Sequence, residues 1–152
     1  MSINVLALGK TRQDYLIQGI SEFQKRLSRY TTIKLIELPD LKISLESQEL
    51  TREKEAEILL KYIKSTDYLI ALDEKGNSLS SIEFAQHLEN ILRRDIVFCI
   101  GGIHGLSGQV LQRADYKLSF SSFTFTHQMI RLLLFEQLYR AFNILKGGQY
   151  HK

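Results

Sequence analysis

Short apolar runs alternate with longer amphipathic segments along this chain of 152 residues. Apolar runs of about four to eight residues, bounded by turn residues, are typical of strands buried on both faces of a parallel sheet. The sequence predicts such strands at Ile3–Leu8, Thr32–Leu38, Asp67–Leu72, Ile96–Ile100 and Tyr116–Phe120. Strands that alternate with helices indicate an α/β fold with a mainly parallel sheet flanked by helices.

Apolar residues that recur every three or four positions predict the helices between these strands. A capping-box pattern at Ser80 and Glu83 predicts the start of one of them. No linker or repeat divides the chain, so we expect a single domain over residues 1–152. The other predicted helices lie at Lys10–Tyr30, Leu50–Lys64, near Ser107–Arg113 and at about Thr126–Leu145; Asp73–Asn77 is predicted as a turn and Leu41–Gln48 as a mobile loop.

Two loops are expected at the carboxyl edge of the sheet, where ligands gather in parallel α/β folds. Gly101-Gly102-x-x-Gly105 allows close backbone approach and offers free N–H groups. It is neither a dinucleotide fingerprint nor a P-loop, and an ordinary strand-to-helix turn explains it equally well. The loop Ser121–Thr126 carries no charge, which suits hydrogen bonds to a neutral base rather than a phosphate or metal. The alternative is a helix entry with Thr126 as its N-cap.

The last predicted helix is apolar around nearly its whole circumference, from Met129 to Leu145. One face of such a helix covers the sheet, and the other needs a partner. We therefore predict a homodimer through this C-terminal helix. Deep burial within one subunit is the alternative.

Composition places few further limits on function. The chain is 44% hydrophobic and 24% charged, as in globular proteins, and its net charge of +3 favours a polyanionic partner only weakly. No transmembrane run or export signal is present, and the lone Cys99 lies in an apolar strand. We expect a cytoplasmic protein whose buried thiol is inert.

The histidines give one functional candidate. Cys and His spacing does not support a metal site, and no Gly-x-Ser-x-Gly elbow supports a hydrolase. His127, beside a helix start, is interpreted as structural, whereas His151 follows Tyr150 in a polar tail with no packing reason to be there. Lys10 follows the first strand, at the edge where it can meet a phosphate.

Four motifs together resemble one family over the whole chain. The motifs are Ile100-Gly101-Gly102-x-x-Gly105-Leu106-Ser107, Thr124-x-Thr126-His127-x-x-x-Arg131, Leu138-Tyr139-Arg140-Ala141 and Tyr150-His151. On these motifs the chain is similar to the large-subunit ribosomal RNA methyltransferase H family, the small stand-alone SPOUT methyltransferases.

This resemblance implies a homodimer with a C-terminal trefoil knot, formed from about residue 70 to residue 152, which binds S-adenosylmethionine. It implies methylation of N3 of a pseudouridine in helix 69 of 23S rRNA, on the assembled ribosome. The cofactor positions that carry over are Leu72, Gly102, Ser121, Ser122, Phe123, Thr124, Phe125 and Thr126.

Catalysis is expected from His151 as general base, reaching over the partner's cofactor, with Tyr150 closing the pocket. Arg131 and Arg140 are candidates for dimer or phosphate contacts. Lys152 stands where some members have arginine, so it keeps the charge but not the bidentate fork. His104 receives no family role.

Two alternative functions stay open at this point. The chain could be a SPOUT enzyme that methylates a tRNA ribose, or a non-enzymatic RNA-binding or ribosome assembly factor. The sequence alone does not identify the general base, and it leaves roles for His104 and His127 undecided.

Overall fold

Five parallel strands form the central sheet in the computed structural model, which describes residues 1–41 and 47–152. The strand order is β2-β1-β4-β3-β5, and every neighbouring pair is parallel. The predicted α/β class with a mainly parallel sheet is therefore confirmed. The strands are β1 (Ser2–Leu8), β2 (Thr32–Leu38), β3 (Tyr68–Ser78), β4 (Ile96–Ile100) and β5 (Tyr116–Ser119).

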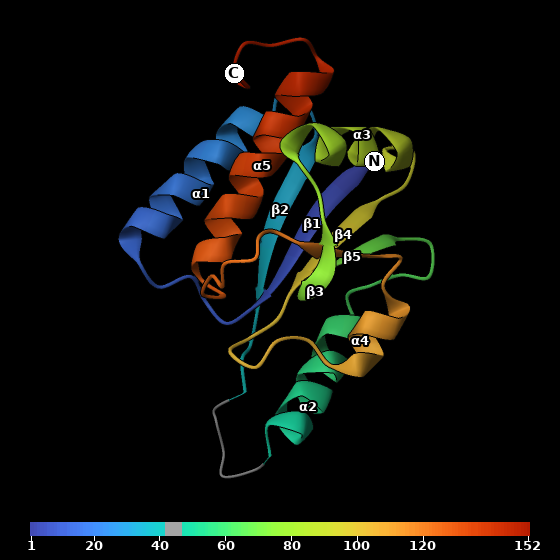
Figure 1. Cartoon of the computed structure of the whole chain (residues 1–152). Helices are drawn as coiled ribbons and strands as arrows, with labels where there is room; N and C mark the ends of the chain where they lie inside the picture. The colour runs from blue at the N-terminus through green and yellow to red at the C-terminus, as the bar shows by residue number, and fades with distance from the viewer. Residues whose placement is uncertain (42–46) are drawn as a thin grey trace.

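Helices cover both faces of this sheet and bury two separate apolar cores (Figure 1). Alternate residues of β1 supply both cores, because successive side chains of a strand point to opposite faces. Ile3, Val5 and Ala7 belong to one core, and Leu6 and Leu8 belong to the other. The helices are α1 (Asp14–Leu27), α3 (Ser81–Ile91) and α5 (Met129–Leu145) on one face, and α2 (Gln48–Leu60) and α4 (Gly108–Arg113) on the other.

Local capping signals place two helix starts where the sequence predicts them. The Ser80 hydroxyl accepts from the Glu83 N–H at 3.2 Å, and the Glu83 carboxylate accepts from the Ser80 N–H at 2.7 Å. Ser107 caps the short helix α4 by accepting from the Val110 N–H. Each bond satisfies an N–H group that has no partner inside its helix.

Two predicted helix boundaries are wrong, and one predicted loop is not tested. Helix α1 begins at Asp14 rather than at Lys10, because the chain is extended at Gln13. Helix α2 ends at Leu60 rather than at Lys64, and Tyr62 beyond its end is 52% exposed. The predicted loop Leu41–Gln48 lies largely outside the described residues.

The predicted turn Asp73–Asn77 is also wrong, because β3 continues through it to Ser78. Leu72 and Asn77 both pair with Leu118 of β5, so the residues between them bulge out of the ladder. Gly76 in this bulge passes so close to β5 that an added Cβ would lie 2.7 Å from the Lys117 carbonyl oxygen. The pairing with β5 therefore resumes beyond the bulge, at Asn77 and Ser78.

Helix α5 lies between α1 and α3 on one face of the sheet (Figure 1). None of its residues is fully exposed in the single subunit. Contact with α1 is close, since a Cβ on Gly19 would lie 2.8 Å from Leu132 Cδ1. Much of the apolar circumference of α5 is thus covered within one subunit, and the homodimer stays a prediction. Across the described ranges, we find no helix with the length and hydropathy to cross a membrane.

Candidate functional site

The Gly-rich segment after β4 folds into a tight turn at the carboxyl edge of the sheet. The Gly105 N–H donates to the Gly102 carbonyl at 3.1 Å, and Gly105 adopts φ +78°. A Cβ on Gly101 would lie 2.5 Å from the Gly105 carbonyl carbon, so the two arms of the turn touch. Ile103 at its tip is 70% exposed. The sequence pattern thus marks a backbone approach that only glycine permits.

The second loop, after β5, presents peptide groups and aromatic side chains to solvent. Among the amides of residues 121–125, only that of Phe123 has an acceptor in the described part of the chain, the Ser121 hydroxyl at 3.0 Å. Phe123 is 80% exposed and Phe125 40%. The Thr126 hydroxyl accepts from the Met129 N–H at 3.0 Å, so Thr126 also serves the start of α5 as the alternative interpretation expects. One loop therefore both presents free peptide groups and caps the start of helix α5.

Topology places Leu72 between these loops, because β3 lies between β4 and β5 in the sheet. A cavity of about 200 Å³ opens beside the second loop and includes Ser119, Ser121 and Phe125 in its wall. Its remaining wall comes from the start of α3 and from Leu133 and Gln137 of α5. The cavity therefore borders the second loop and not the Gly-rich turn.

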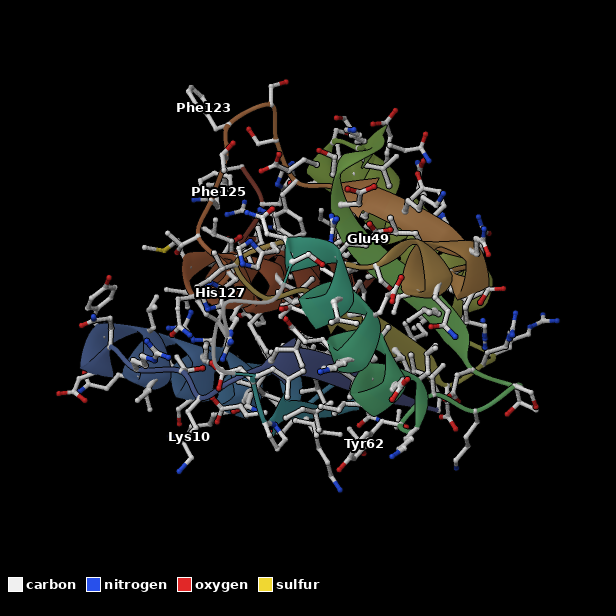
Figure 2. The ribbon with its side chains drawn as sticks, turned by 90° about the horizontal axis from the view of Figure 1, so that it is seen from below. Lys10, Glu49, Tyr62, Phe123, Phe125 and His127 are labelled. Carbon is white, nitrogen blue, oxygen red and sulfur yellow. The ribbon has the colours of Figure 1, made fainter. Side chains whose placement is uncertain are left out.

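Gln128 ties the second loop to the segment after β1. Its side-chain amide donates to the Lys10 carbonyl at 3.0 Å, and its carbonyl oxygen accepts from the Arg12 N–H at 3.0 Å. Figure 2, which looks onto this edge, shows Lys10, His127 and Phe125 on the same side of the molecule. Lys10 is exposed there, as predicted for a residue that meets a phosphate.

Arg131 is fully buried, although it was predicted to contact substrate or a dimer partner. Its guanidinium joins α5 to the ends of β1 and β2, and it has no surface from which to reach a phosphate. A direct substrate contact is incompatible with this burial. The acceptors are the carbonyls of Leu8, Gly9 and His127, the Thr11 hydroxyl and the Glu37 carboxylate.

His127 follows the second loop and is half-buried. Burial lowers the pKa of its imidazole, and the nearby Arg131 and Arg12 lower it further, with Asp40 opposing them. His127 is therefore neutral near pH 7. His104 lies half-buried within the Gly-rich turn.

The C-terminal tail packs against the far end of α5. The Tyr150 N–H donates to Asn143 Oδ1 at 2.9 Å, and its hydroxyl donates to Glu136 Oε1 at 3.0 Å. Arg140 Nη1 lies 3.2 Å from His151 Nδ1. Because a guanidinium can only donate, this contact uses the Nδ1 lone pair of His151.

The predicted catalytic tail and the predicted cofactor loops are at opposite ends of the subunit. Helix α5 begins at the carboxyl edge and ends near the C-terminus (Figure 1). Its 17 residues separate the two regions by about 25 Å. Lys152 at the tail is exposed, and Arg140 beside it pairs with Glu136 at 2.5 Å. One subunit therefore does not bring Tyr150 and His151 to its own loops in this conformation.

Glu55 lies against the Gly-rich turn and was not singled out by the sequence analysis. It is 7% exposed on the inner side of α2, and a Cβ on Gly102 would lie 3.0 Å from its Oε2 atom. Burial and the neighbouring Asp40 raise the pKa of its carboxyl group. A usable signal was present: Thr51, Glu55 and Leu59 recur every four residues, so an acidic residue stands on the inward face of this helix.

Comparison with known proteins identifies the family. Residues 1–151 match a family profile described as "Predicted SPOUT methyltransferase", and the chain belongs to this family. Two solved structures share the fold at low identity. A probable methylase family protein from Haemophilus influenzae Rd KW20 has a TM-score of 0.56 at 14% identity, over 99% of this chain and 70% of that one. A tRNA (m1G37) methyltransferase from Aquifex aeolicus has a TM-score of 0.57 at 11% identity, over 92% and 70%.

Curated relatives narrow the assignment further. A Clostridium perfringens (strain SM101) protein named ribosomal RNA large subunit methyltransferase H 1 is 47% identical and aligned over 100% of both chains. A Halothermothrix orenii protein named ribosomal RNA large subunit methyltransferase H is 48% identical, again over 100% of both chains. The resemblance to the methyltransferase H family that the motifs predict is thus confirmed.

Proposed function

We propose that this protein is an S-adenosylmethionine-dependent methyltransferase of large-subunit ribosomal RNA. The observation that carries the proposal is identity of 47% along the full length to a relative named for that activity. The unused amides of the uncharged loop after β5 also fit a neutral, adenine-like ligand edge. The target proposed is N3 of a pseudouridine in helix 69 of 23S rRNA, on the assembled ribosome.

The proposed chemistry needs positioning and removal of one proton. S-adenosylmethionine, when bound, supplies an activated methyl group. The chain must hold the target base in line and accept the imide proton from N3. His151 is the proposed base, and Tyr150 is proposed to close the pocket. Burial and its bond to Glu136 raise the pKa of the Tyr150 hydroxyl, so this group remains a donor at neutral pH.

A homodimer is part of this proposal. The tail of one subunit lies about 25 Å along α5 from its own loops, which supports a tail that serves the partner's loops. His151 must leave Arg140 before its Nδ1 atom is free to accept a proton. We propose that the partner's surface replaces these tail contacts. The C-terminal trefoil knot from about residue 70 onward stays a prediction of the resemblance.

Deletion of Tyr150–Lys152 tests the role of the tail. We expect methylation of purified ribosomes to be lost while the dissociation constant for S-adenosylmethionine, measured by calorimetry, stays unchanged. Deleting Lys152 alone is the matched control: it removes a candidate substrate contact but keeps Tyr150 and His151, so it should lose less activity than the longer deletion. If the enzyme without Tyr150–Lys152 turns over normally, the tail assignment is wrong. Mass spectrometry of the product distinguishes a methylated base from a methylated ribose.

Mixed dimers test whether the tail acts across subunits. One subunit carries Gly101→Ala, which breaks the Gly-rich turn but keeps the tail, and the other lacks Tyr150–Lys152. Each homodimer should be inactive. Co-expressed subunits should regain activity, because the mixed dimer has one intact site facing one intact tail. Failure to regain activity in a purified mixed dimer would mean that each tail serves its own subunit.

A further inference from the structure

Glu55 is a largely buried carboxyl group with no hydrogen-bond donor among the described residues. It is 7% exposed, and its carboxylate oxygens keep some contact with solvent, since they are not among the fully buried polar atoms that lack a partner. Other polar groups nearby are satisfied, including Thr51, whose hydroxyl donates to the Ser47 carbonyl at 3.3 Å. Burial raises the pKa of Glu55, so its partial removal from water without a protein partner costs free energy. The residue is therefore unfavourable for the free protein and needs another explanation.

The charges around Glu55 favour a donor or cation from outside the chain. Its carboxylate faces Gly102, and the charged residue that acts on it is Asp40, which follows β2 and is itself negative. Arg12 pairs with Asp40 at 3.7 Å, and the described residues give Glu55 no ion pair. The inner surface of the Gly-rich turn is thus negative, in contrast with the uncharged loop after β5.

We propose that Glu55 is a cofactor-binding residue, whose carboxylate accepts a hydrogen bond from S-adenosylmethionine bound against Gly102. Two groups of that molecule have the required chemistry, the α-ammonium group and the ribose hydroxyls. The inference rests on the proposed function, because it uses the same methyl donor. It extends the proposed site from the two loops to helix α2, which lies on the face of the sheet opposite to α3 and α5.

Glu55→Gln tests this proposal, with Glu57→Gln as the matched control. Glu57 is an exposed carboxylate on the same helix, so its substitution removes the same charge without touching the turn. A hydrogen bond to a charged group contributes about 1.5–3 kcal/mol. The dissociation constant for S-adenosylmethionine, measured by calorimetry, should therefore rise at least about tenfold in Glu55→Gln and stay unchanged in Glu57→Gln.

Thermal unfolding of the free protein provides a readout that a structural role would not give. Gln removes an uncompensated buried charge, so the melting temperature of free Glu55→Gln should equal or exceed that of the wild type. Lower affinity together with undiminished stability supports a binding role. A lower melting temperature in the free variant, or an unchanged dissociation constant, would overturn it.

Methylthioadenosine distinguishes the two donor groups, because it keeps the ribose and lacks the ammonium. If Glu55→Gln weakens both ligands, the partner of Glu55 is a ribose hydroxyl. If only S-adenosylmethionine binds more weakly, the partner is the ammonium. Absence of S-adenosylmethionine binding to the wild type would instead contradict the proposed function itself, which separates the two failures.

Discussion

The carboxyl edge of the sheet has two halves, one over β1 and β2 and one over β4, β3 and β5. Both consist of the ends of parallel strands, but different groups cover them. Over β1 and β2, Arg131 fills the edge and donates to the carbonyls of Leu8 and Gly9. Over β4, β3 and β5, glycines and an uncharged loop leave peptide groups without partners and Phe123 exposed. Because an unsatisfied buried polar group costs free energy, the Arg131 hydrogen bonds stabilise the first half, whereas the second half leaves its exposed peptide groups to solvent.

One sheet edge is thus divided between a closed half that is held by a buried side chain and an open half that is exposed to solvent. Arg131 is fully buried over the ends of β1 and β2, where it donates to the Gly9 and Leu8 carbonyls. Its Nε atom also donates to the His127 carbonyl at 3.1 Å, which fixes the end of the open loop. The closed half therefore serves as a rigid support for the open half.

Arg131→Ala should break the closed half and have the largest effect. It would leave several buried carbonyls unpaired and the Glu37 carboxylate without its cation. Each buried carbonyl left unpaired costs about 1–3 kcal/mol, so loss of the Leu8 and Gly9 bonds should lower the free energy of unfolding by about 2–6 kcal/mol, with a smaller contribution from the partly exposed Glu37. Urea denaturation measures it, with Arg29→Ala, an exposed cation on the α1 side, as control. A change below about 1 kcal/mol would contradict the supporting role of Arg131.

Gly101→Ala should break the open half with a smaller effect on stability. Its Cβ would lie 2.5 Å from the Gly105 carbonyl carbon, so the turn must open. Overpacking of this kind costs about 1–3 kcal/mol, and S-adenosylmethionine affinity should fall at least about tenfold. Gly108→Ala is the matched control, because a Cβ there meets nothing within 4 Å. Equal cofactor affinity of the two variants in a calorimetric titration would contradict a role for the turn.

A fall in pH should lower the free energy of unfolding through His127, and this is the smallest effect that we expect. Burial and the cations Arg131 and Arg12 lower the pKa of His127 in the folded state. The unfolded chain then binds a proton more readily, so stability is complete above the unfolded pKa of about 6.5 and is lost as pH falls below it. His127→Asn should flatten this part of the pH–stability curve measured by urea denaturation. A slope identical to that of the wild type would show that His127 does not contribute.

His87 offers a comparison within the same curve, since burial also lowers its pKa. It lies against Tyr116 with ring centroids 4.2 Å apart, and Tyr116 is the first residue of β5, at the end of that strand opposite to the carboxyl edge. His87→Asn should therefore remove part of the acid sensitivity without altering S-adenosylmethionine affinity. Comparison of His87→Asn with His127→Asn therefore distinguishes a general effect on stability from an effect beside the loop after β5.

Local patterns predicted most of the fold and the position of the two loops. Apolar runs identified all five strands of the described sheet, and β2 and β4 match their predicted limits. Ser80 and Ser107 marked helix starts because their caps depend on residues three positions away. The bulge after Leu72 was missed, because its polar residues are typical of a turn and only pairing with β5 keeps them in a strand.

The sequence by itself determined the alternation of strands and helices, the glycine turn and the uncharged loop, since these depend on neighbouring residues. Only the tertiary structure decided that Arg131 is buried, that Glu55 faces Gly102 and that the tail lies away from the loops of its own subunit. Each of these facts joins segments far apart in the chain. Burial and pairing of a charge depend on what the fold brings beside it, which no local pattern specifies.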